Sequence, residues 1–388
     1  MVSFSHRMEK VTGSAIREIF ALLARPGMIS FAGGNPNPKT FPCEDVAAIT
    51  AELMETCGGA VLQYGGTAGL PALQESVCAY AERKGIRAAP EDVVILSGSS
   101  QGIDLVAKIL LNEGDAVLTE APTFLGALQT FRTYGAEPAG VAMDDDGMVM
   151  EDLEQKLQST GAKLIYTIPS FQNPTGRTLP LARRKRMVEL AKRYGALILE
   201  DDPYGDLRYA GQDVLPVYAL DESGETVIHL GSFSKIISPG LRVGFAIGDR
   251  RILRKLVIAK QGVDVHTSNL SQAIVDAFIR SGRLWPHIKA CRAFYARQRD
   301  AMLEAIERYL RGKIRYTRPD GGIFLWASLN EGEDALALFQ KAVEANVAFV
   351  PGTHFFPDLS GKNTLRLNFS MCSPEMIEEG IRRLAGLM

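Results

Sequence analysis

The segment IHLGSFSKIISPGLRVG, residues 228–244, places a lone lysine after an apolar run that has the pattern of a strand. Lys235 stands among serine and glycine residues, and Arg242 follows seven residues later at the head of a second apolar run. The commonest role of any single lysine is an exposed, structural one. Whether Lys235 has a chemical role therefore depends on what the neighbouring strands place beside it.

Strand-like and helical patterns alternate through the middle of the chain. An apolar run at 92–98 precedes a helical pattern at 100–111, and a second helical pattern, 181–195, ends in Gly195, where a C-cap glycine is typical. Further short runs rich in apolar and β-branched residues lie at 116–122, 163–170, 196–202, 226–232 and 242–248. Strands buried on both faces and joined by helical crossovers predict a mainly parallel α/β sheet.

The pattern changes after about residue 250 to long helices, of which 281–310 reads as one extended helix. Strand-like runs follow at 322–329, 347–352 and 364–370, with helical patterns between and after them. A chain of 388 residues is longer than one hydrophobic core usually serves. We therefore predict an N-terminal segment packing on the small domain and the site (1–45), a large α/β domain (46–285) and a small C-terminal α+β domain (286–388).

Composition excludes several classes of protein. The chain has 46% hydrophobic and 23% charged residues and a net charge of -2, which gives no electrostatic reason to expect nucleic acid or an anionic membrane as partner. No apolar run is long enough to span a bilayer and the start lacks a secretory signal, so the cytoplasm is the expected location. Five cysteines without a CxxC pair indicate free thiols, and five histidines without metal-ligand spacing predict no metal site.

Polar residues follow the first strands at the edge where ligands gather in open α/β sheets. In SGSSQG, Ser99 and Ser100 open a helix whose N-terminus could hold a phosphate, although a glycine turn with serine caps is the alternative. Phe124 in APTF could stack on a flat ring or belong to the core. Asn173 in QNPTG could be a ligand or only part of a turn.

Two further strand ends carry charge. The run at 196–202 ends in the adjacent carboxylates Asp201 and Asp202, which are costly to bury unpaired, so a solvated loop is the alternative there. Lys235 ends the next strand. Together the strand ends offer partners for a phosphate, a ring, a hydroxyl and an aldehyde. They outline a site for a planar, phosphorylated, amine-reactive cofactor.

The ordered set YGGTAGLPALQ, SGSSQGID, NPTG, EDDPYG and SFSK–PGLRVG resembles the fold type I pyridoxal-phosphate aminotransferases. It is most similar to the class I branch that contains 2-aminoadipate and kynurenine aminotransferases. The resemblance runs from SAIREIF near the start to LRLNFS near the end. It implies a large cofactor-binding domain, whose mainly parallel mixed sheet lies between helices, and a smaller α+β domain.

The resemblance also implies which residues hold the cofactor. Lys235 would attach covalently to the aldehyde of pyridoxal 5'-phosphate, Asp201 would pair with the ring nitrogen, and Tyr204 would hydrogen-bond the phenolic oxygen. Asn173 would hold that same oxygen and face the substrate, and Phe124 would stack on the ring. The phosphate would be held by Ser99, Ser100, Ser232, Ser234 and Arg242.

Chemistry supports these roles. A carboxylate at the ring nitrogen keeps it protonated, so the ring withdraws electrons from the reacting carbon. Once released from the cofactor, Lys235 is well placed as a general base, and we expect Arg242 and desolvation to lower its pKa.

Shared sites and substrate contacts follow from the same resemblance. Tyr64 would reach the phosphate of a neighbouring subunit, which implies a homodimer. Arg366 would grip the substrate α-carboxylate with two parallel hydrogen bonds. Arg17 matches a position that reaches the side-chain pocket in the relatives and would pair with a distal carboxylate, although a solvated helix arginine is the alternative. Gly33 and Gly34 would let the backbone pass close to the substrate.

The implied activity is amino transfer between an L-amino acid (2-aminoadipate, aromatic, or branched and aliphatic) and a 2-oxo acid, with 2-oxoglutarate as the expected acceptor. A pyridoxal-phosphate C–S lyase on the same scaffold would keep Lys235, Asp201 and Arg366 and is one alternative. A non-catalytic sensor is another, since this domain also occurs fused to winged-helix DNA-binding domains. No basic helix-turn-helix segment precedes SAIREIF, which disfavours the sensor.

Overall fold

The computed structural model describes residues 5–9 and 27–388, and its largest sheet has eight strands. These are β2 (Val93–Leu96), β3 (Ala116–Ala121), β4 (Glu137–Asp144), β5 (Gly147–Met148), β6 (Leu164–Thr167), β7 (Leu197–Asp202), β8 (Val227–Ser232) and β9 (Gly244–Ile247). Their order across the sheet is β2-β9-β8-β7-β6-β3-β4-β5. Neighbouring strands from β8 to β4 are parallel, whereas β9 and β5 run antiparallel to their neighbours. The predicted mainly parallel sheet is confirmed.

Strands β4 and β5 are absent from the sequence prediction. They form the end of the sheet, and Val141 is the only residue of β4 that is buried. The sequence of β4 therefore lacks the continuous apolar run that marks the central strands.

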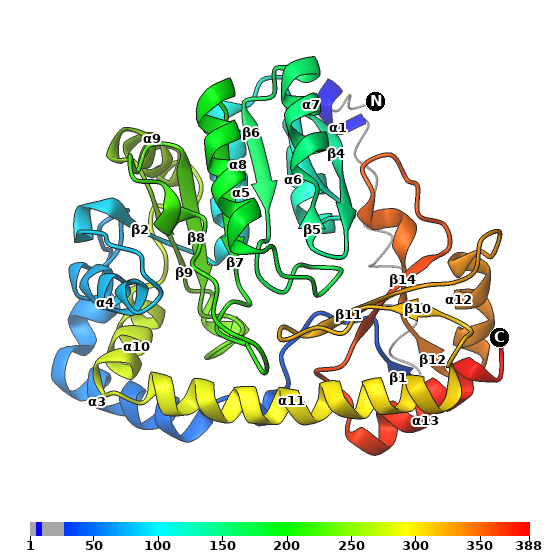
Figure 1. Ribbon diagram of the computed structural model, residues 1–388. Coiled ribbons are helices and arrows are strands. Elements are labelled where there is room, and N and C mark those ends of the chain that lie inside the picture. Colours follow the sequence, from blue (N-terminus) through cyan, green and yellow to red (C-terminus); the bar gives the residue numbers. More distant parts are fainter. Residues whose placement is uncertain (1–4, 10–26) are drawn as a thin grey trace, which may run out of the picture.

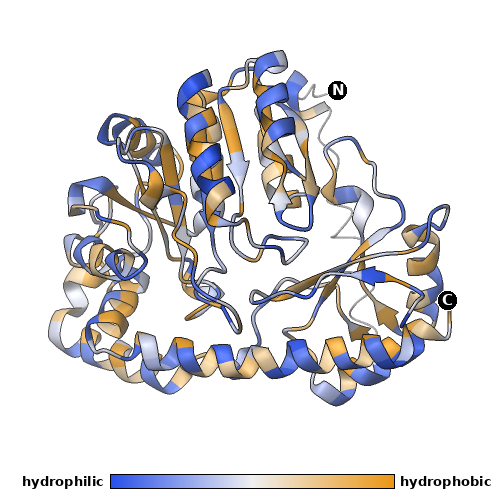
Figure 2. Cartoon of the chain, in the orientation of Figure 1, coloured by the Kyte–Doolittle hydropathy of each residue, from blue (hydrophilic) through white to orange (hydrophobic). Residues whose placement is uncertain are grey.

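Helices cover both faces of the large sheet (Figure 1). Ile165 and Ile198 pack with α7 and α8, whereas Tyr166 and Leu199 pack with α5 and α6, because side chains along a strand alternate between faces. Figure 2 shows that β6 is mostly hydrophobic, while the helices beside it mix hydrophobic and hydrophilic residues. The helices around this sheet are α3 (Cys43–Val61), α4 (Pro71–Glu82), α5 (Ser99–Leu110), α6 (Leu125–Thr133), α7 (Met150–Thr160), α8 (Leu181–Tyr194), α9 (Arg250–Gln261) and α10 (Asn269–Arg280).

A single helix, α11 (Leu284–Tyr309), runs along the bottom of the molecule as drawn in Figure 1 and leads from the large sheet to the C-terminal part. The predicted extended helix is thus confirmed. The C-terminal part contains an antiparallel sheet of order β10-β11-β14-β13. Its elements are β10 (Arg315–Tyr316), β11 (Phe324–Ser328), α12 (Ala335–Glu344), β12 (Val347–Ala348), β13 (Val350–Pro351), β14 (Thr364–Asn368) and α13 (Pro374–Ala385).

The N-terminal residues that the structure describes touch both halves of the molecule. A short helix, α1, spans His6–Glu9, and β1 (Ile29–Ser30) pairs in parallel with β12. The carbonyl of Ala32 then accepts a hydrogen bond from Arg366, and that of Gly34 accepts one from Lys235. Short 3-10 helices complete the chain: η1 (Pro38–Thr40), η2 (Pro90–Asp92), η3 (Tyr218–Leu220), η4 (Pro239–Leu241) and η5 (Gly352–Phe355). The domain limits at 45/46 and 285/286 stay predictions.

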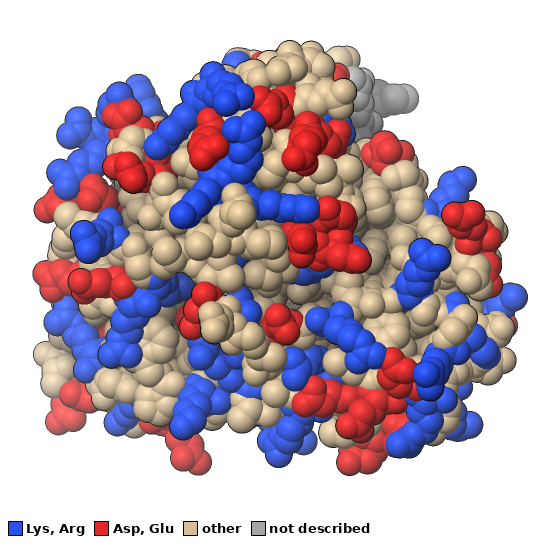
Figure 3. All heavy atoms as spheres, in the orientation of Figure 1, with Lys and Arg blue, Asp and Glu red and all other residues tan. Residues whose placement is uncertain are grey.

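The surface carries charges of both signs. On the face in Figure 3, lysine and arginine side chains alternate with aspartate and glutamate, which agrees with the net charge of -2. Across residues 5–9 and 27–388, none of the helices has the length and apolar character needed to cross a membrane.

Candidate active site

A cavity of about 360 Å³ lies where β7 and β8 end, beside the start of α5 and next to β14. Most of the predicted site residues line this cavity, but Gly33 and Tyr64 do not. Arg17 lies outside the described residues. The predicted residues that do line it are Gly34, Ser99, Ser100, Phe124, Asn173, Asp201, Tyr204, Ser232, Ser234, Lys235, Arg242 and Arg366.

Lys235 follows β8, and its pKa is lower than that of an ordinary lysine. Its Nζ donates to the carbonyl oxygen of Gly34 at 3.0 Å, and no carboxylate of the described residues forms an ion pair with it. Burial, together with the nearby cations Arg242 and Arg366, lowers the pKa of Lys235 to about 8. The ammonium group can therefore release its proton near neutral pH, as a nucleophilic or basic lysine must.

Asp201 is the second-last residue of β7, and one of its two carboxylate oxygens has no hydrogen-bond partner among the described residues. Its Oδ2 accepts a hydrogen bond from the hydroxyl of Tyr166 at 2.9 Å, whereas its buried Oδ1 has no partner among the described residues. Only 3% of Asp201 and 6% of Asp202 is exposed, so the alternative of a solvated loop is wrong. Burial raises the pKa of Asp201 to about 6. A buried acceptor without a donor is costly, which indicates that a ligand donor belongs at Oδ1.

The start of α5 forms an anion cradle with neighbouring side chains. Gly98, which precedes the helix, has φ +89, and a Cβ there would lie 2.5 Å from Nη2 of Arg242. This backbone conformation favours glycine, because a residue with a side chain is strained at such a φ. Ser99 and Ser100, the first two residues of the helix, line the same cavity as Arg242, Ser232 and Ser234. Helix N-termini and cations bind phosphate groups.

Arg366 on β14 is a buried cation without a carboxylate partner among the described residues. Its Nη1 donates to Oδ1 of Asn173 at 2.9 Å and its Nη2 to the carbonyl of Ala32 at 2.8 Å, while Nε has no partner there. The guanidinium lies 4.2 Å from the ring centre of Phe324 and 5.0 Å from that of Phe355. Burial lowers the pKa of Arg366 to about 10. A cation held in this way is suited to a carboxylate ligand.

Tyr166, Phe324 and Phe355 support the site and are among the residues that the sequence did not predict. Tyr166 lies on β6, the neighbour of β7, and its position in an otherwise apolar strand was the available signal. Phe324 and Phe355 flank Arg366 from other parts of the small domain, and nothing in their local sequence marks them.

Tyr64 stands apart from the cavity. Its side chain is 82% exposed, and its ring meets that of His266 edge-on at 5.9 Å. Within one chain it therefore contributes nothing to the site.

The chain matches the family model for aminotransferase class I and II over residues 26–384. It is 44% identical over 388 residues to aromatic-amino-acid aminotransferase 1 of Thermococcus litoralis, with 98% of this chain and 93% of that protein covered. Kynurenine aminotransferase of Pyrococcus horikoshii has a structure with TM-score 0.95 and 43% identity, covering 99% and 96% of the two chains. The alpha-aminoadipate aminotransferase of Thermus thermophilus, solved with N-(5'-phosphopyridoxyl)-L-leucine, gives 0.92 and 40% over the same shares.

With a lysine, a carboxylate and an anion cradle meeting in one cavity, this chain belongs to the class I and II aminotransferase family. It is a pyridoxal-phosphate-dependent aminotransferase of fold type I. The predicted family, fold, reaction and cofactor are thereby confirmed.

Proposed function

We propose that the residues lining the cavity hold pyridoxal phosphate in the roles that the sequence analysis gave them. The unpartnered Oδ1 of Asp201 is the observation that carries the proposal, because a protonated ring nitrogen supplies the missing donor. Tyr204 and Asn173 are both buried beside it and suit a phenolic oxygen. Phe124 lies on the cavity wall as a stacking partner. The phosphate is bound by Ser99, Ser100, Ser232, Ser234 and Arg242.

When bound, the cofactor supplies an electron sink for the carbon that loses its proton. The chain's own residues do the rest. Lys235 anchors the cofactor and then moves the proton at its Nζ, for which its pKa of about 8 is suited. Asp201 holds a proton on the ring nitrogen, and Arg366 orients the substrate through its α-carboxylate.

For substrates, we infer an L-amino acid donor with an aromatic, branched or 2-aminoadipate side chain, and 2-oxoglutarate as acceptor. The names of the relatives support this range, since they act on aromatic amino acids, kynurenine or alpha-aminoadipate. A Cβ at Gly34 would lie 3.3 Å from Cζ of Phe324 at the cavity wall, so glycine there leaves room beside the substrate.

A panel of amino donors, each offered with 2-oxoglutarate and with pyruvate, tests this proposal when the products are identified. We expect a new amino acid from the acceptor in every active pair. Release of ammonia and pyruvate from a sulfur-containing donor without any acceptor would contradict it.

We also propose a homodimer in which Tyr64 completes the site of the partner. Apolar side chains close in sequence to Tyr64 or to its contact His266 lack cover within one chain: Leu62, Val263 and Val265 are 48% to 69% exposed. Exposed apolar groups of this kind are typical of an interface between chains.

Mixed dimers test the role of Tyr64. If Tyr64→Phe and Lys235→Ala chains are combined, each mixed dimer should contain one intact site, because the intact tyrosine serves the other chain's intact lysine. The cofactor affinity of that site should equal the wild-type value, as measured by titration of activity with pyridoxal phosphate. Recovery of no intact sites would place Tyr64 in its own chain's site, and a fully active monomer would refute the dimer.

Arginine variants test substrate binding. Arg366→Ala should lower the affinity for every donor about 10- to 100-fold, since a charge-assisted hydrogen bond contributes roughly 1.5 to 3 kcal/mol. Arg17→Ala should lower the affinity for 2-oxoglutarate and 2-aminoadipate to a similar degree. The affinity for leucine and phenylalanine should stay nearly unchanged. Half-reaction kinetics with each donor separate the two effects. Equal losses for acidic and apolar donors in Arg17→Ala would show that this arginine has no part in side-chain selection.

A further inference from the structure

Three buried carboxylates end β7 in succession. Glu200, Asp201 and Asp202 are 0%, 3% and 6% exposed. Because side chains alternate along a strand, Asp201 faces the active-site cavity, whereas Glu200 and Asp202 face the opposite side. Each buried carboxylate needs a donor or a cation to offset the loss of water.

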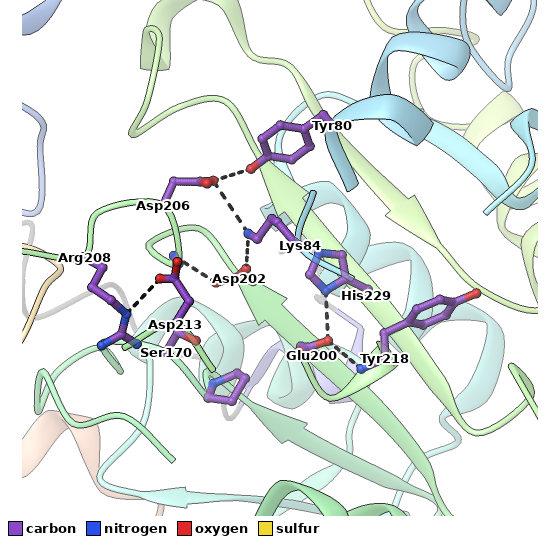
Figure 4. A network of polar contacts seen from close by, with 12 residues as sticks. Tyr80, Lys84, Ser170, Glu200, Asp202, Asp206, Arg208, Asp213, Tyr218 and His229 are labelled. Atoms are coloured by element: carbon purple, nitrogen blue, oxygen red, sulfur yellow. Dashed lines mark hydrogen bonds and ion pairs between the residues drawn. The ribbon is translucent and has the colours of Figure 1, made fainter. Parts of the chain in front are cut away.

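The two carboxylates that face away from the cavity have different partners (Figure 4). Glu200 accepts from the backbone N–H groups of Val217 and Tyr218 and lies 2.9 Å from Nδ1 of His229. Asp202 accepts from the backbone N–H of Gly205 at 2.9 Å and from Nζ of Lys84 at 2.5 Å. A full positive charge therefore sits directly behind the strand end that carries Asp201.

Lys84 is fixed in this place. It follows the end of α4, its side chain is 14% exposed, and its Nζ also lies 3.6 Å from Oδ2 of Asp206. Figure 4 shows the ammonium group between the two carboxylates, with Tyr80 donating to Asp206 on the far side. Burial alone would lower the pKa of Lys84, but Asp202 and Asp206 raise it well above the usual value. Lys84 thus stays charged throughout the working pH range.

The charge of Asp202 reaches Asp201. Burial is the main reason why the pKa of Asp201 rises, and the negative charge of Asp202 raises it further. Burial also opposes ionisation of Asp202, but Lys84 lowers the pKa of that carboxyl below its usual value. Two adjacent buried carboxylates without a cation would compete for one proton.

We propose that Lys84 is a positioning residue of the cofactor site, whose ammonium group cancels the charge of Asp202 so that Asp201 alone sets the negative field at the ring nitrogen. The inference rests on the proposed role of Asp201. Other ionisable groups face this part of the chain as well: Tyr80, Tyr166, Arg184, Glu200, Asp206 and His229.

The test is a pH titration of the holoenzyme's visible absorption, which follows the proton on the Lys235 nitrogen. Lys84→Met removes one positive charge from between Asp202 and Asp206, which favours the protonated form, so the midpoint should rise by about 0.5 to 1 pH unit. Asp202→Asn leaves the positive charge instead, so the midpoint should fall by a similar amount. The double variant removes a neutral pair and should return to within about 0.2 unit of wild type.

Lys192→Met is the matched control. Lys192 pairs with the buried Asp221 at 2.8 Å, and neither residue lines the cavity. This variant should lose stability in denaturant without moving the midpoint, which separates the loss of an ion pair to a buried carboxylate from a changed field at the cofactor.

The outcomes are distinct. Opposite shifts in the single variants and recovery in the double variant support the proposal. Shifts of the same sign, or none, would overturn it, and if Lys84→Met does not fold, the fall expected for Asp202→Asn decides alone. If Lys235→Ala has the same visible absorption as wild type, the proposed function is contradicted instead.

Discussion

Replacement of Lys235 by alanine should abolish turnover while the protein stays folded. Nζ of Lys235 is proposed both to anchor the cofactor and to carry the proton at the reacting carbon, and a positioned general base alone contributes on the order of 10²- to 10⁴-fold. The expected result is a loss of at least that size in kcat, together with loss of the yellow colour given by the lysine-bound cofactor. Single-turnover measurements with a good amino donor and an absorption spectrum of the purified variant check both.

Lys235→Arg is the matched variant, because it keeps a positive charge in the cavity but cannot bind the aldehyde or act as a base at neutral pH. It should be as inactive as the alanine variant. Undiminished turnover in either variant would remove Lys235 from the mechanism.

Asp201→Asn should retain most of the bound cofactor and slow removal of the α-proton by about two orders of magnitude, because the ring nitrogen loses its charged hydrogen-bond partner. Stopped-flow kinetics of the amino-donor half-reaction measure this step directly. Asp213→Asn is the control, since Asp213 is an 81% exposed carboxylate on the neighbouring loop. A mild effect of Asp201→Asn would show that another group serves the ring nitrogen.

The same substitution should stabilise the protein without cofactor at alkaline pH. Because the pKa of Asp201 rises from 3.8 to about 6 in the folded chain, the folded state holds that proton more tightly than the unfolded state. Asp201 therefore costs stability as the pH rises through about 6, by up to about 3 kcal/mol once it is ionised. Denaturant unfolding should show Asp201→Asn above wild type at pH 8 and close to it at pH 4. A gain at pH 4 as large as that at pH 8 would contradict this account.

Most of the catalytic face could be predicted because strand ends determine which residues meet. Ser99 and Lys235 follow the apolar strands β2 and β8, and Asp201 lies near the end of β7. These strands point the same way, so their carboxyl ends lie at one edge of the sheet. The apolar runs are unmistakable because both faces of these strands are buried. The missed strands, β4 and β5, lie at one end of the sheet: β4 has a single buried residue, and β5 is buried but only two residues long.

Contacts between distant parts of the chain could not be predicted in this way. Lys84 and Asp202 are 118 positions apart, and no local pattern pairs them. The sequence offered a solvated loop as one explanation of the two aspartates, whereas the structure shows them buried on opposite sides of the strand. The contacts of Phe324 and Phe355 with Arg366 could not be predicted either, because they depend on how the small sheet packs.

Lys260 is another lysine near the start of α5, and its surroundings differ from those of Lys235. Lys260 is fully buried, but its ammonium group already bonds both oxygens of Asp264, Oε1 of Gln101 and the hydroxyl of Thr267. Lys235 has one backbone carbonyl as its partner among the described residues. We therefore expect only Lys235 to react with the aldehyde.

Reduction of the holoenzyme with borohydride, followed by proteolysis and mass spectrometry of the labelled peptide, tests that claim most directly. The account predicts a single phosphopyridoxyl group on Lys235, within SFSKIISPGLR, and no label when Lys235 is replaced by alanine. A label on Lys260, on Lys84 or on any other lysine of the wild-type enzyme would contradict it.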